Sequence, residues 1–225
     1  MIQADGTLRP RLVWDWPLRL FHWLLVLAIA ILFVTGKLGG NWMEWHKRTG
    51  YVVLGLVFFR LIWGVAGGYY ARFANFVRGP RAVLAFVRGR HGESQMRRGH
   101  AGHNPLGALS VLAMLLAIAL QAGTGLFAND DILLEGPYAS LVSKELSDWL
   151  TGVHKINSNV ILGLIALHLI AIAFYFFRRK TNLVMPMLTG RKLMAIDAPQ
   201  ASRPAWLAAL AILVSAASVY LMVGR

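Results

Sequence analysis

The chain has 225 residues, of which 57% are hydrophobic and only 15% charged, and its formal net charge is +13. Such a composition is too apolar for an ordinary soluble domain, and the basic residues flank apolar runs, which argues against a nucleic-acid-binding protein. The absence of cysteine excludes disulfides, thiolate-bound iron–sulfur clusters and covalently attached c-type haem, so histidine is the first choice as a ligand for any redox metal.

Five apolar segments are long enough to cross a membrane, which takes about 20 helical residues for a hydrocarbon core of about 30 Å. They are Pro17–Gly36, Lys47–Gly68, Pro105–Phe127, Val153–Phe177 and Ala205–Val223. The first segment is longer than the apolar part of a signal peptide and lacks a small-residue cleavage site after it, so we expect it to remain as a helix. The sequence predicts an all-α integral membrane protein, a four-helix transmembrane bundle plus one extra C-terminal transmembrane helix.

Basic residues are distributed unevenly between the predicted loops. The segments before the first span, between the second and third, and between the fourth and fifth carry Arg9, Arg11, Arg19, Arg72, Arg78, Arg81, Arg88, Arg90, Arg97, Arg98, Arg178, Arg179, Lys180, Arg191, Lys192 and Arg203. The opposite side has only Lys37, Lys47, Arg48, Lys144, Lys155 and Arg225, and its loop 129–152 is rich in acidic residues. The positive-inside rule therefore predicts a cytoplasmic N-terminus and a periplasmic C-terminus.

Two of these loops have patterns of their own. Phe73–Arg90 mixes apolar residues with arginines, which indicates an amphipathic helix on the cytoplasmic surface; the alternative is a solvated basic linker. Tyr138–Leu150 is expected to form a short outer helix over the bundle.

Four histidines fall within the predicted spans or at their mouths: His22, His46, His154 and His168. A single intramembrane histidine often makes only a hydrogen bond between helices, but it is costly without a partner. His154 and His168 are 14 residues apart, so a helix separates them by about 21 Å in height and brings them back to nearly the same face. The fourth span thus presents one histidine near each membrane surface.

The predicted topology places the other two histidines at the same two depths. His22 lies six residues into the first span, at the level of His168, and His46 opens the second span, at the level of His154. This predicts an inner pair, His22 with His168, and an outer pair, His46 with His154, provided that the fourth helix contacts the first and second. Two imidazoles on opposite sides of an iron porphyrin fill both axial positions, a geometry suited to electron transfer. We therefore predict a transmembrane dihaem bundle with two b-type haems.

Two further residues repeat the 14-residue offset. Arg60 lies 14 residues after His46, at the depth of the inner pair, where a haem propionate would supply its counter-charge; the alternative is that Arg60 reaches out to the inner interface. Gly36 lies 14 residues after His22, at the depth of the outer pair, where a missing side chain would let a flat macrocycle approach; the alternative is a plain helix terminus.

Several motifs on successive spans resemble the bacterial cytochrome b561 and nickel-hydrogenase b-type cytochrome subunit family. They are Val13-Trp-Asp-Trp-Pro-Leu-Arg-Leu-Phe-His-Trp23, Trp42-Met-Glu-Trp-His-Lys-Arg-Thr-Gly-Tyr51, Phe59-Arg-Leu-Ile-Trp-Gly64, His103-Asn-Pro-Leu-Gly107, Gln121-Ala-Gly-Thr-Gly125 and Gly152-Val-His-Lys-Ile-Asn157 through His168. The chain is also similar, more distantly, to the membrane subunit of respiratory formate dehydrogenases.

This resemblance implies a four-helix bundle with two b haems in a bacterial inner membrane, with ligands at His22, His46, His154 and His168. Residues 1–180 are expected to form the dihaem domain and residues 181–225 a linker and the fifth helix. The basic four-helix form of the family lacks this helix, for which we expect a role in packing, assembly or partner contact. Some relatives act as homodimers.

The resemblance also implies a quinone as substrate, bound by the inner haem. His103 and Asn104 at the start of the third span, together with Arg19, are candidates for this site; the alternative is that Asn104 only caps its helix before Pro105. On the outer side, Lys47, Arg48 and Lys155 flank the outer ligands and are candidates for contacting propionates, superoxide or an acidic partner; the alternative is that they only extend to the membrane interface. His91 and His100 are expected to be solvated.

Three functions are compatible with these features. The leading hypothesis is electron transfer between a periplasmic redox protein, such as a c-type cytochrome, and the quinone pool. The second is a stand-alone superoxide oxidase that reduces quinone, and the sequence leaves open whether the chain is itself an enzyme. The third is a non-redox membrane scaffold or transporter whose histidines only bridge helices.

Overall fold

The computed structural model of the protein describes residues 8–88, 102–131, 134–195, 199 and 201–224. His91 and His100 lie outside this part of the chain. In chain order the elements are β1 (Leu8–Leu12), α1 (Trp16–Leu38), α2 (Trp42–Ala66), α3 (Phe73–Phe76), α4 (Pro80–Val87), α6 (Pro105–Gly125), a 3-10 turn (Ala139–Leu141), α7 (Lys144–Phe177), α8 (Val184–Thr189), β2 (Arg191–Ala195) and α9 (Ala205–Val223). Five of the helices, α1, α2, α6, α7 and α9, are long and apolar enough to cross a membrane, as predicted.

The long helices begin and end where local chemistry favours it. Asp15 caps α1, since its carboxylate accepts a hydrogen bond from the Leu18 amide at 3.0 Å, and Pro17 lies in the first turn. Gly39 and Gly40, both at positive φ, form the tight turn between α1 and α2. Asn104 and Ser143 cap α6 and α7 in the same way.

Helix α7 differs from the prediction at its start. Its 34 residues begin at Lys144, so the segment expected to be a separate outer helix, Tyr138–Leu150, is instead a 3-10 turn followed by the first turns of α7. The reason is that Ser143 provides the cap and nothing between Lys144 and Val153 ends the helix. At about 1.5 Å per residue α7 is about 51 Å long, so it extends well beyond a hydrocarbon core of about 30 Å.

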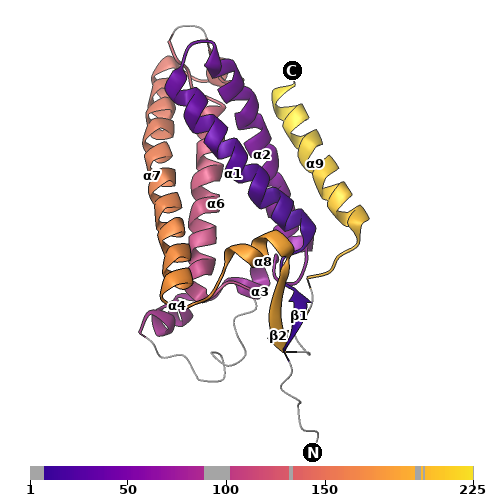
Figure 1. Ribbon diagram of the computed structural model, residues 1–225. Coiled ribbons are helices and arrows are strands. Elements are labelled where there is room, and N and C mark those ends of the chain that lie inside the picture. Colours follow the sequence, from indigo (N-terminus) through magenta and orange to yellow (C-terminus); the bar gives the residue numbers. More distant parts are fainter. Residues whose placement is uncertain (1–7, 89–101, 132–133, 196–198, 200, 225) are drawn as a thin grey trace, which may run out of the picture.

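The helices pack as two antiparallel pairs with α9 outside them. Helix α1 packs on α2, α6 packs on α7, the two pairs meet along α2 and α6, and α9 lies against α2 (Figure 1). The expected contact of α7 with α1 and α2 is made through side chains, since the backbone of α7 makes few close approaches to either helix in the described residues. Side chains in the middle of the bundle bridge this space, among them Ala28, Val53, Val57, Ala117, Ile118 and Ile161.

The smaller elements gather at one end of the bundle, which we call the sheet end: β1, β2, α3, α4 and α8 (Figure 1). Strands β1 and β2 pair antiparallel, with Leu8 opposite Ala195 and Leu12 opposite Arg191. This pairing joins segments from both sides of residue 180, where we predicted the boundary between the two parts of the chain. The boundary itself stays a prediction. The opposite end, the loop end, holds the turn at 39–40 and the loop between α6 and α7.

The segment predicted as one amphipathic helix, Phe73–Arg90, forms two short helices. Helix α3 ends at Phe76, and Pro80 starts α4 because proline lacks the amide hydrogen that a continuing helix would need. Residues 89–90 lie outside the described part.

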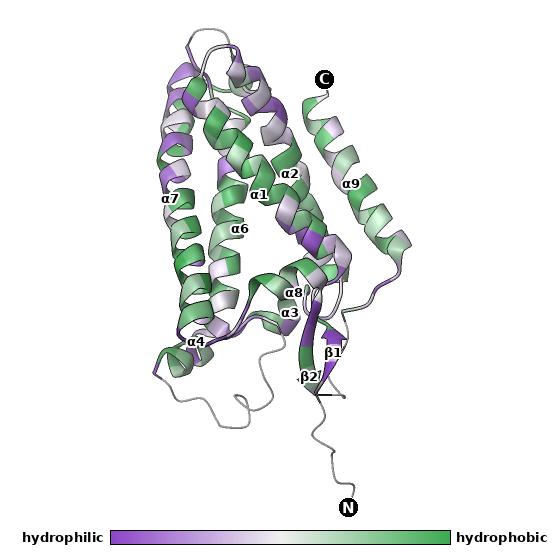
Figure 2. Cartoon of the chain, in the orientation of Figure 1, coloured by the Kyte–Doolittle hydropathy of each residue, from purple (hydrophilic) through white to green (hydrophobic). Residues whose placement is uncertain are grey.

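Hydrophobic residues dominate the middle of the long helices, and polar residues dominate their ends (Figure 2).

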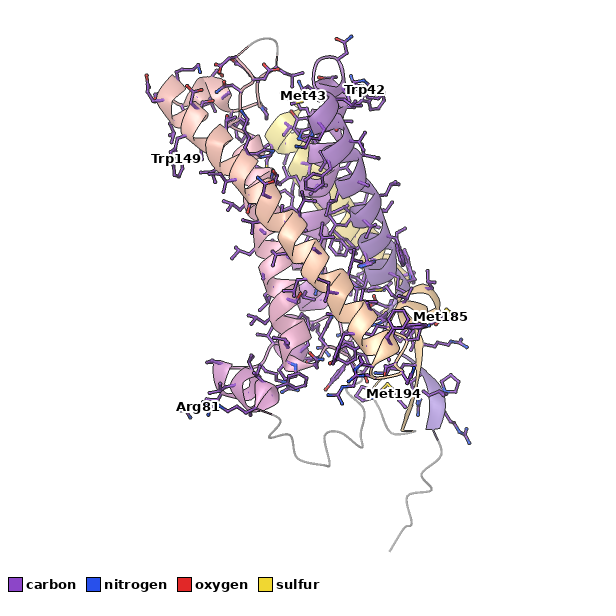
Figure 3. The ribbon with its side chains drawn as sticks, turned by 60° about the vertical axis from the view of Figure 1, so that its left-hand side comes forward. Trp42, Met43, Arg81, Trp149, Met185 and Met194 are labelled. Carbon is purple, nitrogen blue, oxygen red and sulfur yellow. The ribbon has the colours of Figure 1, made fainter. Side chains whose placement is uncertain are left out.

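Several tryptophans at the ends of the long helices are exposed, although Trp63 is buried. Trp149 points away from α7 in Figure 3 and is 63% exposed, and Trp42 at the start of α2 is 52% exposed. Indole rings favour the interface between lipid headgroups and hydrocarbon, so these positions agree with a membrane surface near the loop end.

Candidate functional site

The structure brings together the two histidines of the predicted outer pair. His46 from α2 and His154 from α7 face each other with their ring centroids 6.2 Å apart and their planes inclined by 69°. For a metal held about 2 Å from a nitrogen of each ring, the two centroids lie roughly 6 Å apart. Edge-to-face aromatic pairs have similar separations, so the distance alone does not distinguish a metal site from a simple ring contact.

The hydrogen bonds of the two rings are of the kind that metal-binding histidines make. Nδ1 of His46 lies 3.0 Å from the carbonyl oxygen of Leu32, and Nδ1 of His154 lies 3.0 Å from that of Gln121. Because a carbonyl can only accept, Nδ1 must carry the proton in both rings, which leaves the lone pair on Nε2. Histidines that bind metals are oriented in this way by a second hydrogen bond.

A cavity of about 550 Å³ lies at this pair and is lined by both imidazoles. Its volume falls in the range of small-molecule and cofactor pockets, about 300–1,000 Å³. Most of its wall is apolar, with Ile29, Leu32, Phe33, Val53 and Leu54 among the lining residues, while Lys47 and Lys155 supply positive charge. Arg48 is exposed and pairs with Glu44 at 2.8 Å, and Lys47 also contacts Glu44, at 3.1 Å. A flat apolar ring with acidic substituents fits these walls.

Gly36 lies against the imidazole of His46. A Cβ at this position would lie 3.1 Å from Cε1 of His46, so the missing side chain makes room for the imidazole itself. Gly125, which the sequence analysis did not single out, stands in the same relation to His154, at 3.2 Å. Contact of Gly36 with a macrocycle stays a prediction.

Polar residues on α6 and α7 hold His154 in place. The Gln121 side chain donates to the His154 carbonyl oxygen at 3.1 Å, and the buried Asn157 donates to Gln121 Oε1 at 2.7 Å and to the Ala117 carbonyl at 2.8 Å. The sequence analysis did not single out Asn157. An asparagine one turn after an intramembrane histidine was the available signal.

The inner pair lies toward the sheet end of the same bundle. His22 on α1 and His168 on α7 are close enough for their charges to interact. Nδ1 of His22 is buried and has no hydrogen-bond partner among the described residues. The inner pair therefore lacks, on the α1 side, the carbonyl contact that orients both outer rings.

Arg60 is buried on α2, and its charge acts on His103. It is 3% exposed, so the alternative in which it reaches out to the interface is wrong. Its guanidinium lies over the Phe73 ring at 4.5 Å, and its Nη1 is buried without a hydrogen-bond partner in the described part of the chain. A buried guanidinium with an unused donor suits an acidic group such as a carboxylate.

His103 lies between two aromatic rings near the inner pair, with its centroid 4.8 Å from Trp14 and 4.9 Å from Phe76. Burial, together with the positive charges of Arg60 and His168, lowers the pKa of His103 to about 4. Its Nδ1 is buried and has no partner among the described residues. His103 is thus neutral at physiological pH and has an unused polar atom.

The other two residues predicted near the inner pair are engaged elsewhere. Asn104 caps α6 by accepting from the Gly107 amide at 2.6 Å, which was the structural alternative, and also donates to the Tyr175 hydroxyl at 2.7 Å. Arg19 donates from Nη1 to the Leu188 carbonyl of α8, while its buried Nε has no partner in the described residues.

Comparison with known protein families decides the class of this site. The family described as prokaryotic cytochrome b561 matches residues 13–190, about four fifths of the chain. The chain belongs to the prokaryotic cytochrome b561 family. No curated protein and no solved structure matches it.

Members of the prokaryotic cytochrome b561 family bind b-type haem and transfer electrons in the membrane, so the chain is a multi-pass membrane cytochrome. The predicted family and fold class are confirmed, and the reading as a non-redox scaffold or transporter is wrong. No group of three His, Asp or Glu side chains suited to a metal ion occurs in the described part of the chain. A histidine pair is enough for b-type haem, because the porphyrin supplies the other four ligands.

Proposed function

We propose that this cytochrome b561 carries electrons across the membrane through two b-type haems, one between His46 and His154 and one between His22 and His168. The observation that best supports the proposal is the outer pair: two rings 6.2 Å apart, each with Nδ1–H bound to a backbone carbonyl, beside a largely apolar cavity. When bound, haem iron supplies one-electron chemistry between its ferric and ferrous states.

The charged residues around each pair have complementary roles in this proposal. Lys47 and Lys155 line the outer cavity, where their ammonium groups would neutralise haem propionates. Arg60 would do the same for the inner haem, which would use the guanidinium donor that has no partner in the described residues. The long apolar walls between these charges exclude water from the bundle.

A quinone is the membrane substrate that we propose for the inner end. His103 is neutral, lies near His168 and Arg60, and keeps Nδ1 available for a quinone oxygen. Arg19, with its buried Nε, is the second candidate. Asn104 would contribute only by fixing the start of α6, since both ends of its amide are already engaged.

The proposed orientation has the sheet end in the cytoplasm and the loop end in the periplasm of a bacterial inner membrane. It is supported by the excess of arginine and lysine in the segments at the sheet end. At the loop end, acidic residues outnumber basic ones: Asp131, Glu135, Glu145 and Asp148 are exposed and Asp130 is half-buried, while Lys144 pairs with Asp131 and Asp148. Such an excess of acidic residues would favour a basic redox protein, such as a c-type cytochrome, by electrostatic steering. A homodimer stays a prediction from the relatives.

Haem content tests the proposal directly. The purified protein should contain two b haems per chain with low-spin spectra, and His154→Ala should retain only one, because its partner His46 cannot supply both axial bonds. A matched His103→Gln variant should keep both haems and lose electron transfer to quinone. A haem-to-protein ratio near one in the unmodified protein, or high-spin spectra, would contradict the two-haem arrangement.

A second candidate function is oxidation of superoxide without a protein partner. The observation in its favour is that Lys47 and Lys155 line the outer cavity, where they would attract a small anion. Stopped-flow decay of superoxide in the isolated protein, with and without quinone, distinguishes the two functions. A decay rate no faster than that of haem-free buffer excludes the oxidase.

A further inference from the structure

The two rings of the outer pair lie in matching notches, each formed by a threonine–glycine dipeptide on the neighbouring helix. His46 lies against Thr35-Gly36 of α1, and His154 lies against Thr124-Gly125 of α6. The threonine Oγ1 is 3.4 Å from Nδ1 of His46 in the first notch and 3.2 Å from Nδ1 of His154 in the second. In both, the carbonyl that binds Nδ1 at 3.0 Å belongs to the residue three positions before the threonine.

The hydroxyl of each threonine can only accept from the imidazole. Thr35 Oγ1 donates its single hydrogen to the Ile31 carbonyl at 2.7 Å, and Thr124 Oγ1 donates to the Leu120 carbonyl at 2.8 Å. With that hydrogen in use, the oxygen offers a lone pair to the Nδ1–H of the histidine. Both threonines are nearly fully buried, at 3% and 4% exposed, so water does not compete for these contacts. Each outer Nδ1–H therefore has two acceptors, a carbonyl and a hydroxyl.

The inner pair is built differently. Nδ1 of His22 is buried with no acceptor among the described residues, and within the same residues no hydrogen bond is found for the His168 ring. A hydrogen bond from Nδ1–H makes the opposite nitrogen a more basic ligand. A more basic axial ligand stabilises ferric iron, which has the higher positive charge, relative to ferrous iron. The two sites thus differ in a property that sets the reduction potential.

We propose that Thr35 and Thr124 are positioning residues that orient the outer ligands and hold the reduction potential of the outer haem below that of the inner haem. The inference rests on the proposed two-haem function. The inference adds an order of the two reduction potentials, in which the inner haem is reduced before the outer haem. Gly36 and Gly125 also help to position the two rings, because a methyl group at either glycine would push the imidazole away from its acceptors.

Removing the hydroxyls tests the proposal. Thr35→Val and Thr124→Val keep the branched shape, and each should raise the midpoint potential of the outer haem. At a fixed applied potential the ratio of ferrous to ferric outer haem should rise severalfold, where a tenfold change corresponds to about 59 mV for one electron. The outer haem is identified as the component that disappears from the redox titration of His154→Ala. The low-spin EPR signal of the outer haem, which depends on the angle between the imidazole planes, should change as well. Thr35→Ser and Thr124→Ser keep the hydroxyl, so they should leave the midpoint potential and the EPR signal as in the unmodified protein.

The glycines provide an independent pair of variants in case a valine variant loses haem. Gly125→Ala should shift the outer potential in the same direction, whereas Gly123→Ala, two residues away on α6 with open space around its Cβ, should leave it unchanged. If two haems are bound and neither the valine variants nor Gly125→Ala shifts the outer midpoint, the inference is wrong while the proposed function stands. An equal shift of both haems also overturns it. If the protein binds no second haem, the proposed function fails first.

Discussion

At the scale of single residues, Asp15 organises the sheet end of α1 and α2. Besides capping α1, its carboxylate accepts hydrogen bonds from Trp63 Nε1 at 3.1 Å and from the Gly68 amide at 3.2 Å. Asp15 is 4% exposed, and burial raises the pKa of its carboxyl above the usual value. These hydrogen bonds and the charge of Arg60 offset only part of that rise. One side chain thus satisfies buried donors from three places in the chain.

We expect Asp15→Ala to lower the free energy of unfolding by about 2–4 kcal/mol, because it removes a helix cap and leaves two buried donors without an acceptor. Asp15→Asn keeps one acceptor oxygen and should lose less. Loss of haem absorbance during thermal or detergent unfolding measures the change. The exposed Asp131, changed to Asn, is the control and should cost less than about 0.5 kcal/mol. An equal loss in Asp131→Asn would show that the buried donors are not the cause.

At the scale of elements, α9 is attached to the bundle through small residues. Ala208, Ala211 and Ser215 are nearly fully buried and lie on one face of α9, and two of them pack with Phe59 and Trp63 of α2. Small residues let two membrane helices approach closely, which increases van der Waals contact. Arg203 donates to the Gly67 carbonyl at 3.1 Å before the helix, and Tyr138 donates to the Met222 carbonyl at 2.8 Å near its end. Helix α9 is therefore held at both ends.

A disulfide across the contact between α2 and α9 tests this arrangement. A Cβ at Gly55 would lie 3.5 Å from Cγ2 of Val219, so Gly55→Cys with Val219→Cys should form a disulfide on mild oxidation. The natural chain has no cysteine, so no other thiol competes. Adding Ala208→Leu should reduce the yield severalfold by pushing the helices apart. Gly55→Cys with Leu213→Cys is the control, since Leu213 is 66% exposed on another face of α9. Equal yields from both pairs would contradict the packing.

At the scale of the whole molecule, an odd number of spans places β1 and the end of α9 at opposite ends of the bundle (Figure 1). The basic segments and the short elements share the sheet end, whereas the outer cavity and the acidic loop lie toward the loop end. This asymmetry would direct a protein partner to one membrane face and the proposed quinone chemistry to the other.

Single cysteines test the orientation. In intact cells whose outer membrane is permeable to the reagent, Leu141→Cys at the loop end should react with a membrane-impermeant maleimide. Arg78→Cys at the sheet end should react only after the inner membrane is opened. Both residues are exposed, so burial does not explain a difference between them. Labelling of Arg78→Cys in intact cells, with Leu141→Cys protected, would reverse the proposed topology.

The membrane spans were predictable because hydropathy depends only on composition along the chain. The start of α7, at the loop end, was not predictable in this way. Lys144, Glu145 and Asp148 do not belong in hydrocarbon, so the hydropathic segment ends before them, although the helix continues to the Ser143 cap. Strands β1 and β2 were also missed, because each is short and its partner lies some 180 residues away in the chain. Helix α8 escaped notice for a related reason, since its contacts with Arg19 and Trp23 join segments distant in sequence.

The sequence by itself determined which five helices of the described chain are long and apolar enough to span a membrane. It also gave the relative heights of the histidines along each helix, because a helix converts residue number directly into height. The tertiary structure decided everything that depends on which helices are neighbours. It placed carbonyls and threonine hydroxyls at Nδ1 of His46 and His154, covered Arg60 with Phe73, and enclosed His103 between Trp14 and Phe76. The physical reason is that rotation about the helix axes and the choice of packing partner come from side-chain contacts between distant segments, which no spacing within one helix encodes.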